Sequence, residues 1–254
     1  MSASTAPLSS TAPLSSTAHP SSTAHPNLSS VYVTGGAGGL GAAVVAAVRA
    51  HGGRAAVIDR VAPSTGVDLP HAVADLGDST QAARAVDELA QSFGPPTAVV
   101  TAAGTDACGA LGDVPVDAWE AVVRVNLLGT VAVVRAALPY LLESHGSVVT
   151  VASTLGIKAV GDATAYCASK FGVVGFTRAL ATELAGQVGV TLLIPGGMST
   201  AFFDGRPEQY RPGPDAVLND PANVAELVIT ALTQPAGSAL RELVAATETE
   251  PSWP

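Results

Sequence analysis

Lysine is scarce in this chain of 254 residues, which has only Lys158 and Lys170. Basic residues number 12 against 21 acidic ones, so the formal net charge is −9 at pH 7. Nucleic acids and anionic membrane surfaces carry negative charge and repel a protein of this kind. We therefore expect no nucleic-acid partner and no membrane partner.

Cysteine is equally scarce. Cys108 and Cys167 offer neither metal-ligand spacing nor a disulfide framework, so we expect no metal site and a reducing compartment. Mean hydropathy is high at +0.38, but no apolar run reaches the roughly 20 residues that cross a bilayer. The first basic residue is Arg49, and secretory signals and transit peptides need positive charge earlier. These absences favour a cytoplasmic protein.

The beginning of the chain repeats one six-residue unit four times. Residues 4–27 read STAPLS, STAPLS, STAHPS and STAHPN. Such a segment has too little apolar surface to offset the entropy lost on ordering. We expect a disordered low-complexity tail over residues 1–28 and one folded domain over residues 29–254.

The rest of the chain alternates apolar strands with helices. The expected strands cover residues 31–34, 54–59, 71–76, 97–104, 146–153, 189–197 and 240–245. One expected helix follows the glycine cluster and ends near residue 51. The others cover residues 79–93, 117–142, 164–185 and 221–234. Continuously apolar strands are typical of a parallel sheet covered on both faces. The pattern predicts an α/β fold with a doubly wound parallel sheet, the Rossmann fold, in which ligands bind at the carboxyl ends of the strands.

A glycine-rich turn follows the first expected strand, in VYVTGGAGGLGAAV at residues 31–44. Gly35, Gly39 and Gly41 allow a tight turn and a close approach of backbone amides to a phosphate. Asp59 comes 18 residues after Gly41, where an acid can accept hydrogen bonds from the ribose hydroxyls of a dinucleotide. Its charge would repel a 2′-phosphate, which favours NAD. Arg60 could soften that repulsion, so NADP stays open, and Asp59 could also be a solvated acid.

Tyr166 and Lys170 lie four residues apart in an otherwise apolar helix. Residues i and i+4 share one helix face, so the ammonium can sit near the phenol and lower its pKa. A tyrosine with a lowered pKa can exchange a proton with an alcohol near neutral pH. The alternative is ordinary packing, because the lysine stem can lie along an apolar face.

Over residues 30–245 the chain resembles the short-chain dehydrogenase/reductase family, in its short single-domain form. The matching segments stand in the family's order: TGGAGGLG at 34–41, Asp59, Asp75-Leu76, TAAG at 101–104, Asn126, Ser153, Tyr166, Lys170 and PGGMST at 195–200. One departure is Thr101, where the family commonly has asparagine that supports the sheet.

The resemblance implies a role for each matching residue. Tyr166 would be the acid/base, Lys170 would lower its pKa and bind the nicotinamide ribose, Ser153 would hold the substrate oxygen, and Asn126 would fix a water. The implied cofactor-binding residues are Gly35, Gly38, Gly39, Leu40, Gly41, Asp59, Arg60, Asp75, Leu76, Ala102, Ala103, Gly104, Tyr166, Lys170, Pro195, Gly196, Met198 and Thr200. Of these, Asp75 and Leu76 would hold the adenine, and Thr200 with the Pro195-Gly196 turn would hold the carboxamide.

These observations favour an NAD(P)-dependent oxidoreductase acting on a small secondary alcohol or ketone. An NADPH-dependent reductase of 3-oxoacyl groups on a carrier protein stays open, although the net charge and Gln187, where such reductases often have arginine, disfavour it. A cofactor-binding redox sensor without turnover is a further alternative. The family's usual dimerisation surfaces correspond to residues 117–142 and 164–185, which implies a homodimer or homotetramer.

The Gly- and Pro-rich stretch after Thr200 is expected to form a lid. Phe202, Phe203 and Tyr210 could line an apolar pocket beneath it. Arg206 and Arg211 in the same stretch could meet a carboxylate or face water.

Overall fold

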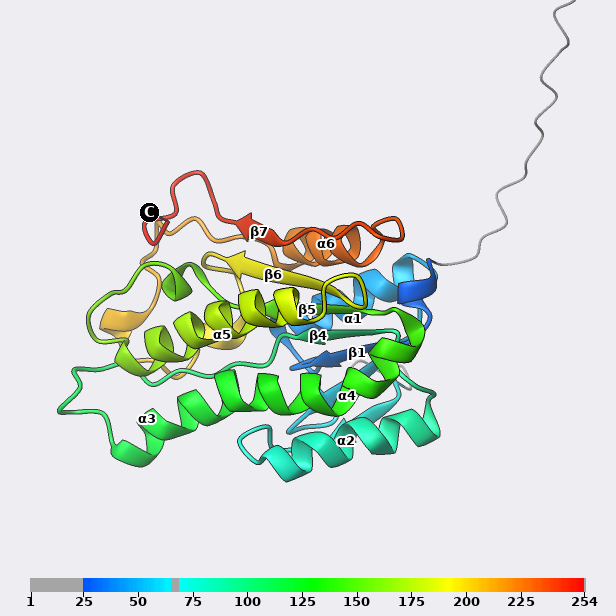
Figure 1. Ribbon diagram of the computed structural model, residues 1–254. Helices are drawn as coiled ribbons and strands as arrows, with labels where there is room; N and C mark the ends of the chain where they lie inside the picture. Colours follow the sequence, from blue (N-terminus) through cyan, green and yellow to red (C-terminus); the bar gives the residue numbers. More distant parts are fainter. Residues whose placement is uncertain (1–24, 65–68, 254) are drawn as a thin grey trace, which may run out of the picture.

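The structure is a computed structural model, and it describes residues 25–64 and 69–253. Seven parallel strands form one sheet in the order β3-β2-β1-β4-β5-β6-β7 (Figure 1). They are β1 Val31–Thr34, β2 Ala55–Asp59, β3 His71–Val73, β4 Ala98–Thr101, β5 Ser147–Val151, β6 Gly189–Pro195 and β7 Glu242–Ala245. The predicted doubly wound fold is confirmed.

Helices cover both faces of the sheet (Figure 1). They are α1 Gly39–Ala50, α2 Ser79–Ser92, α3 Val116–Val123, α4 Thr130–Ser144, α5 Thr164–Glu183 and α6 Pro221–Leu232. On one face α1 packs against α6, and on the other face α2 packs against α4. α5 lies on the same face as α4, since residues of both belong to one buried cluster.

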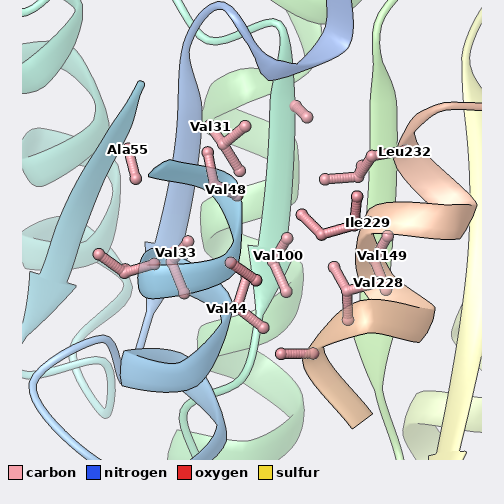
Figure 2. Packing of buried hydrophobic residues seen from close by; sticks show 14 of the residues in the cluster. Val31, Val33, Val44, Val48, Ala55, Val100, Val149, Val228, Ile229 and Leu232 are labelled. Atoms are coloured by element: carbon pink, nitrogen blue, oxygen red, sulfur yellow. The ribbon is translucent and has the colours of Figure 1, made fainter. Parts of the chain in front are cut away.

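Alternate residues of each strand point into opposite cores. Val31 and Val33 belong to the cluster under α1 and α6, whereas Tyr32 between them belongs to the cluster under α2, α4 and α5. Figure 2 shows the first cluster, where Val44 of α1 and Ile229 of α6 approach the strand valines. Both sides of a strand are therefore apolar, which explains why the strands read as continuous hydrophobic runs.

The expected helix over residues 117–142 is longer and less regular than the sequence indicates. It runs from Val116 to Ser144 but contains a π-helical segment, η2 Arg124–Gly129, between α3 and α4. By length and composition it could cross a membrane, but 39% of its most apolar stretch is buried. It packs against α2 and α5.

The folded domain begins earlier than predicted. A short 3₁₀ helix, η1 Pro26–Leu28, precedes β1, and Leu28 is only 1% exposed. The Asn27 side chain donates hydrogen bonds to Ser147 Oγ at 3.0 Å and to the Leu232 carbonyl at 3.1 Å. These contacts assign residues 25–28 to the domain rather than to the tail. The repeats before them, residues 1–24, lie outside the described residues.

The order of the strands reverses between β1 and β4, since the chain winds outward in opposite directions from this pair. Thr34 is in register with Ile58 on one side and with Thr101 on the other. The strands therefore end at a common level. Such a reversal leaves a crevice at the carboxyl ends of the strands, where ligands bind.

Candidate active site

The glycine turn after β1 has the geometry expected for a phosphate cradle. Gly35 adopts φ +68°, and a Cβ built there would lie 2.8 Å from the Cα of Ala103. A Cβ on Gly41 would collide with the carbonyl oxygen of Gly35. Gly38, the N-cap residue of α1, has no side chain, so the first amides of the helix face open space. The turn fits the pyrophosphate of a dinucleotide.

Asp59 lies against this turn. Its Oδ2 accepts a hydrogen bond from the Ala37 amide at 3.0 Å, and its Oδ1 accepts a longer one from the Val61 amide at 3.3 Å. Each carboxylate oxygen keeps lone pairs for further donors, as binding of ribose hydroxyls requires. Arg60 follows directly and is exposed.

The loop after β6 closes the other side of the turn. A Cβ on Gly39 would lie 3.6 Å from the Thr200 methyl group. The Gly196 amide donates to the Ala245 carbonyl at 2.9 Å, and the Gly197 amide donates to Glu250 Oε2 at 2.9 Å. The PGGMST loop, residues 195–200, is thus held by β7 and by the segment that follows it. Met198 in this loop bridges to Asn219.

Lys170 is buried at the centre of the site, with 4% of its surface exposed. Its Nζ donates to the Val151 carbonyl at 2.9 Å and lies 5.7 Å from the centre of the Tyr166 ring. Burial lowers the pKa of this ammonium to about 8. The helical spacing therefore places both side chains together, and the lysine is held by the end of β5.

The pKa of Tyr166 departs from the sequence-based expectation. Burial raises it to about 12, and the hydrogen-bonding hydroxyl of Ser153 opposes the rise. The expected lowering of this pKa by Lys170 is wrong for the protein alone, because burial of the phenol dominates and Lys170 is not among the groups that shift the pKa. Ser153 also accepts a hydrogen bond from the Leu155 amide at 3.1 Å, which fixes its position beside the phenol.

Asn126 lies in the π-helical segment and is fully buried. Its amide donates to the Thr105 carbonyl at 2.9 Å and to Ser169 Oγ at 3.0 Å, and its Oδ1 accepts from the Thr105 amide at 2.8 Å. Ser169 in turn donates to the Tyr166 carbonyl at 2.8 Å. This network joins the loop after β4 to α5. A π-helical turn is frequent at functional sites. No sequence pattern marks this turn, nor the roles of Thr105 and Ser169.

The remaining predicted cofactor residues divide between the site and the core. A Cβ on Gly104 would lie 3.7 Å from Lys170 Nζ, so this glycine borders the site. Leu40 and Leu76 are buried in the two cores, at 6% and 7% exposure, and their side chains face packing partners. Asp75 is exposed, and its carboxylate accepts a hydrogen bond from the Gly77 amide at 2.8 Å.

The stretch after Thr200 folds over Tyr166. The Phe202 ring lies 5.8 Å from the Tyr166 ring, and Phe203 packs edge-on against Phe202 at 5.7 Å. Tyr210 does not join them, since its hydroxyl donates to Asp162 at 3.0 Å. Arg206 meets a carboxylate of the protein itself, that of Asp106, at 2.6 Å. Sequence reasoning missed Asp106, because nothing local marks a partner 100 residues away.

The comparisons agree with this geometry. A family model described as short chain dehydrogenase matches residues 29–211. The chain belongs to the short-chain dehydrogenase family. The 2-dehydro-3-deoxy-L-rhamnonate dehydrogenase (NAD(+)) of Sphingomonas sp. strain SKA58 is 36% identical, over 69% of this chain and 74% of the relative. The cis-2,3-dihydrobiphenyl-2,3-diol dehydrogenase of Pseudomonas sp. strain KKS102 is 38% identical, over 66% of this chain and 65% of the relative.

Solved structures support the fold. Ligand-free aldohexose dehydrogenase of Thermoplasma acidophilum superposes with a TM-score of 0.77 at 21% identity, covering 87% of this chain and 93% of that one. An alcohol dehydrogenase of the archaeon Thermococcus sibiricus, complexed with 5-hydroxy-NADP, gives 0.74 at 21% identity, covering 85% and 95%. The family assigns this chain as a nicotinamide-dependent oxidoreductase that acts on CH–OH groups.

Proposed function

We propose that this enzyme interconverts a small secondary alcohol and its ketone, with NAD favoured over NADP and Tyr166 as the acid/base. The observation that carries the proposal is the meeting of Tyr166, Ser153, Lys170 and Asn126 at the carboxyl edge of the sheet, beside the glycine turn. These side chains come from α5, the π-helical segment η2 and the loop after β5. Their convergence suits proton transfer to or from a substrate oxygen.

In the oxidation direction, the Tyr166 phenolate accepts the hydroxyl proton of the alcohol. The Ser153 hydroxyl donates a hydrogen bond to the substrate oxygen and holds it beside the phenol. An oxidised nicotinamide bound beside the glycine turn would supply the hydride acceptor, and its positive charge, with that of the Lys170 ammonium, would favour the phenolate. With a pKa of about 8, Lys170 can also pass a proton onward near neutral pH, with Asn126 holding the neighbouring loop in place.

Asp59 supports the preference for NAD. Its carboxylate is fixed by the Ala37 amide at the turn, so a 2′-phosphate placed there would meet a negative charge that cannot easily move away. The name of the Sphingomonas relative includes NAD(+), which agrees. Arg60 is exposed and free to turn toward a phosphate. Mutation of Asp59 therefore separates the effect of the carboxylate on cofactor preference from that of Arg60.

The test is a fluorescence titration of the purified chain with NADH and with NADPH. We expect tighter binding of NADH by the unaltered protein, and a reversal or loss of that preference in Asp59→Ser, because one fixed charge near a phosphate changes affinity about tenfold or more. Asp87→Asn, an exposed acid of α2, is the matched control. Tighter binding of NADPH by the unaltered chain would show that Arg60 dominates, and binding of neither would contradict the enzyme proposal.

We also infer a homodimer or homotetramer that buries the outer faces of the long helix Val116–Ser144 and of α5. Three large apolar side chains are exposed there: Val116 at the start of α3 at 74%, Leu128 in η2 at 51% and Phe171 on α5 at 44%. Exposed apolar residues on neighbouring helices favour association with another surface.

A further inference from the structure

A buried ion pair stands beside Tyr166 and has no part in the proton transfer described above. Arg206 Nη2 lies 2.6 Å from Asp106 Oδ2, and the two side chains are 17% and 7% exposed. The pair joins the stretch after Thr200, which covers Tyr166, to the loop after β4. Removing two charges from water is costly, so a pocket for a purely apolar alcohol would gain nothing from such a pair.

The guanidinium is close to the reacting groups. Its carbon lies 4.9 Å from the centre of the Phe202 ring and 4.7 Å from that of Phe203, and Phe202 touches the Tyr166 ring. The charges of both Asp106 and Arg206 act on the Tyr166 phenol, in opposite directions. A substrate held by Tyr166 and Ser153 therefore lies in the field of this pair.

The pair keeps unused hydrogen-bonding capacity. Arg206 Nε is buried and finds no hydrogen-bond partner within residues 25–64 and 69–253. Nη1 makes only a long contact of 3.4 Å to the Tyr210 carbonyl. Asp106 Oδ2 accepts from Arg206 and from the Cys108 thiol, whereas Oδ1 accepts only from the Ala107 amide and has room for one more donor. A buried donor without an acceptor is unfavourable, and a ligand oxygen relieves it.

We propose that the pair recognises a further hydroxyl group on the substrate, so that the enzyme acts on neutral diols or polyols. The hydroxyl oxygen accepts a hydrogen bond from Arg206 Nε, and the hydroxyl donates a hydrogen bond to Asp106. A substrate carboxylate fits poorly, because Asp106 already neutralises the guanidinium and would repel a second anion. An apolar substituent would leave Nε without a partner. This inference rests on the proposed function, since it names the substrate class of the same site.

The experiment compares three substrates that differ in one substituent: cyclohexanol, cyclohexane-1,2-diol and 2-hydroxycyclohexane-1-carboxylate. With NAD⁺ we expect kcat/KM for the diol to exceed that for each of the other two by about tenfold or more. Arg206→Lys keeps the charge opposite Asp106 but removes Nε, and should bring the ratio of diol to cyclohexanol close to one. Arg84→Lys, the same change at an exposed position of α2, should leave the ratio unchanged.

Asp106→Asn tests whether Asp106 excludes anionic substrates. This variant keeps the proposal testable even if the Arg206 variant does not fold. Removing the carboxylate frees the guanidinium for an anion, so the ratio of hydroxy acid to cyclohexanol should rise about tenfold. A hydroxy acid that is already the best substrate of the unaltered enzyme would overturn the inference. So would equal kcat/KM values for cyclohexanol and the diol.

Dead-end complexes separate this inference from the proposed function. In the complex with NADH the alcohols bind without reacting, and their dissociation constants follow from ligand-observed NMR. We expect the diol to bind about tenfold more tightly than cyclohexanol and to lose this advantage in Arg206→Lys. If none of the three is oxidised, the proposed function fails, and this binding ratio still decides the inference. Diol binding no tighter than that of cyclohexanol would contradict it.

Discussion

At the scale of single residues, the buried lysine of the site opposes stability. Lys170 carries a pKa of about 8 instead of the usual 10.5 because it is buried. Between these two values the unfolded chain binds more protons than the folded one, so this residue makes stability rise with pH. Below about pH 8 both states are charged and the full penalty remains. A group retained at such a cost is expected at a functional site.

We therefore predict that Lys170→Met stabilises the protein at pH 7 and that this gain shrinks as pH rises from 8 toward 10.5. The shift corresponds to about 3 kcal/mol between the two limits. Urea unfolding of both proteins at pH 7 and pH 9.5 measures it. Lys158→Met is the control, since that ammonium donates to the Pro251 carbonyl at the surface. A gain for Lys170→Met that does not vary with pH would show that Lys170 stays charged in the fold, with a pKa that burial has not lowered.

Residue-scale features differ in how far the sequence reveals them. Tyr166 and Lys170 could be read from their spacing, because a helix brings i and i+4 together. Gly35 and Gly41 could be read because only glycine allows such close approaches. The raised pKa of Tyr166 could not be read from the sequence, since it depends on burial by distant segments. Thr101 departs from the family pattern, and its buried Oγ1 has no hydrogen-bond partner among the described residues. The free-energy cost of this unpaired oxygen is evident only once the sheet is packed.

At the scale of elements, the segment after β7 acts as a brace for the loop after β6. Glu250 accepts from the Gly197 amide at 2.9 Å and from the Ser252 hydroxyl at 2.5 Å. Ser252 also bonds to Thr154 at 2.6 Å, next to Ser153. Burial favours the neutral acid, but these hydrogen bonds outweigh it and lower the pKa of Glu250. The brace is a carboxylate that holds part of the proposed cofactor site.

We predict that Glu250→Gln weakens NADH binding about fivefold, since one hydrogen bond to a charged group is replaced by a neutral one at a cost of about 1 kcal/mol. Fluorescence titration measures the dissociation constant, and the melting temperature shows whether the fold is intact. Glu248→Gln, at an exposed position two residues earlier, should bind NADH normally. If the two variants behave alike, the segment only packs against the loop and does not position it.

Element order was predictable, whereas element contacts were not. All seven strands and the main helices follow from apolar periodicity and turn residues, with bounds that differ by a few residues. The π-helical segment at Arg124–Gly129 has no periodic signature, because a single widened turn hardly changes the pattern of apolar residues. The contacts of Glu250 with Gly197 and of Arg206 with Asp106 join segments far apart in sequence, and only the fold brings them together.

At the scale of the whole molecule, exposed apolar side chains lie on α3, on the π-helical segment η2 and on α5. α5 runs beside α3 and the π-helical segment, as Figure 1 shows. Leu128 and Phe171 on these elements are half-exposed, although the neighbouring Leu127 is packed against Gly172. A monomer would leave these side chains in water, where burial of each is worth about 1.5–3 kcal/mol.

We predict that the protein is a dimer or tetramer by light scattering, and that Leu128→Glu combined with Phe171→Glu lowers the mass toward that of the monomer, because buried unpaired charges oppose association. Val73→Glu is the matched control. Val73 is 56% exposed but lies on β3, at the far edge of the sheet, so this change should leave the mass unaltered. A monomeric unaltered protein, or a double variant that still assembles, would exclude this surface. NADH binding by the variants then shows whether the site is complete within one chain, as the convergence of Tyr166, Lys170 and Asp59 within a single chain implies.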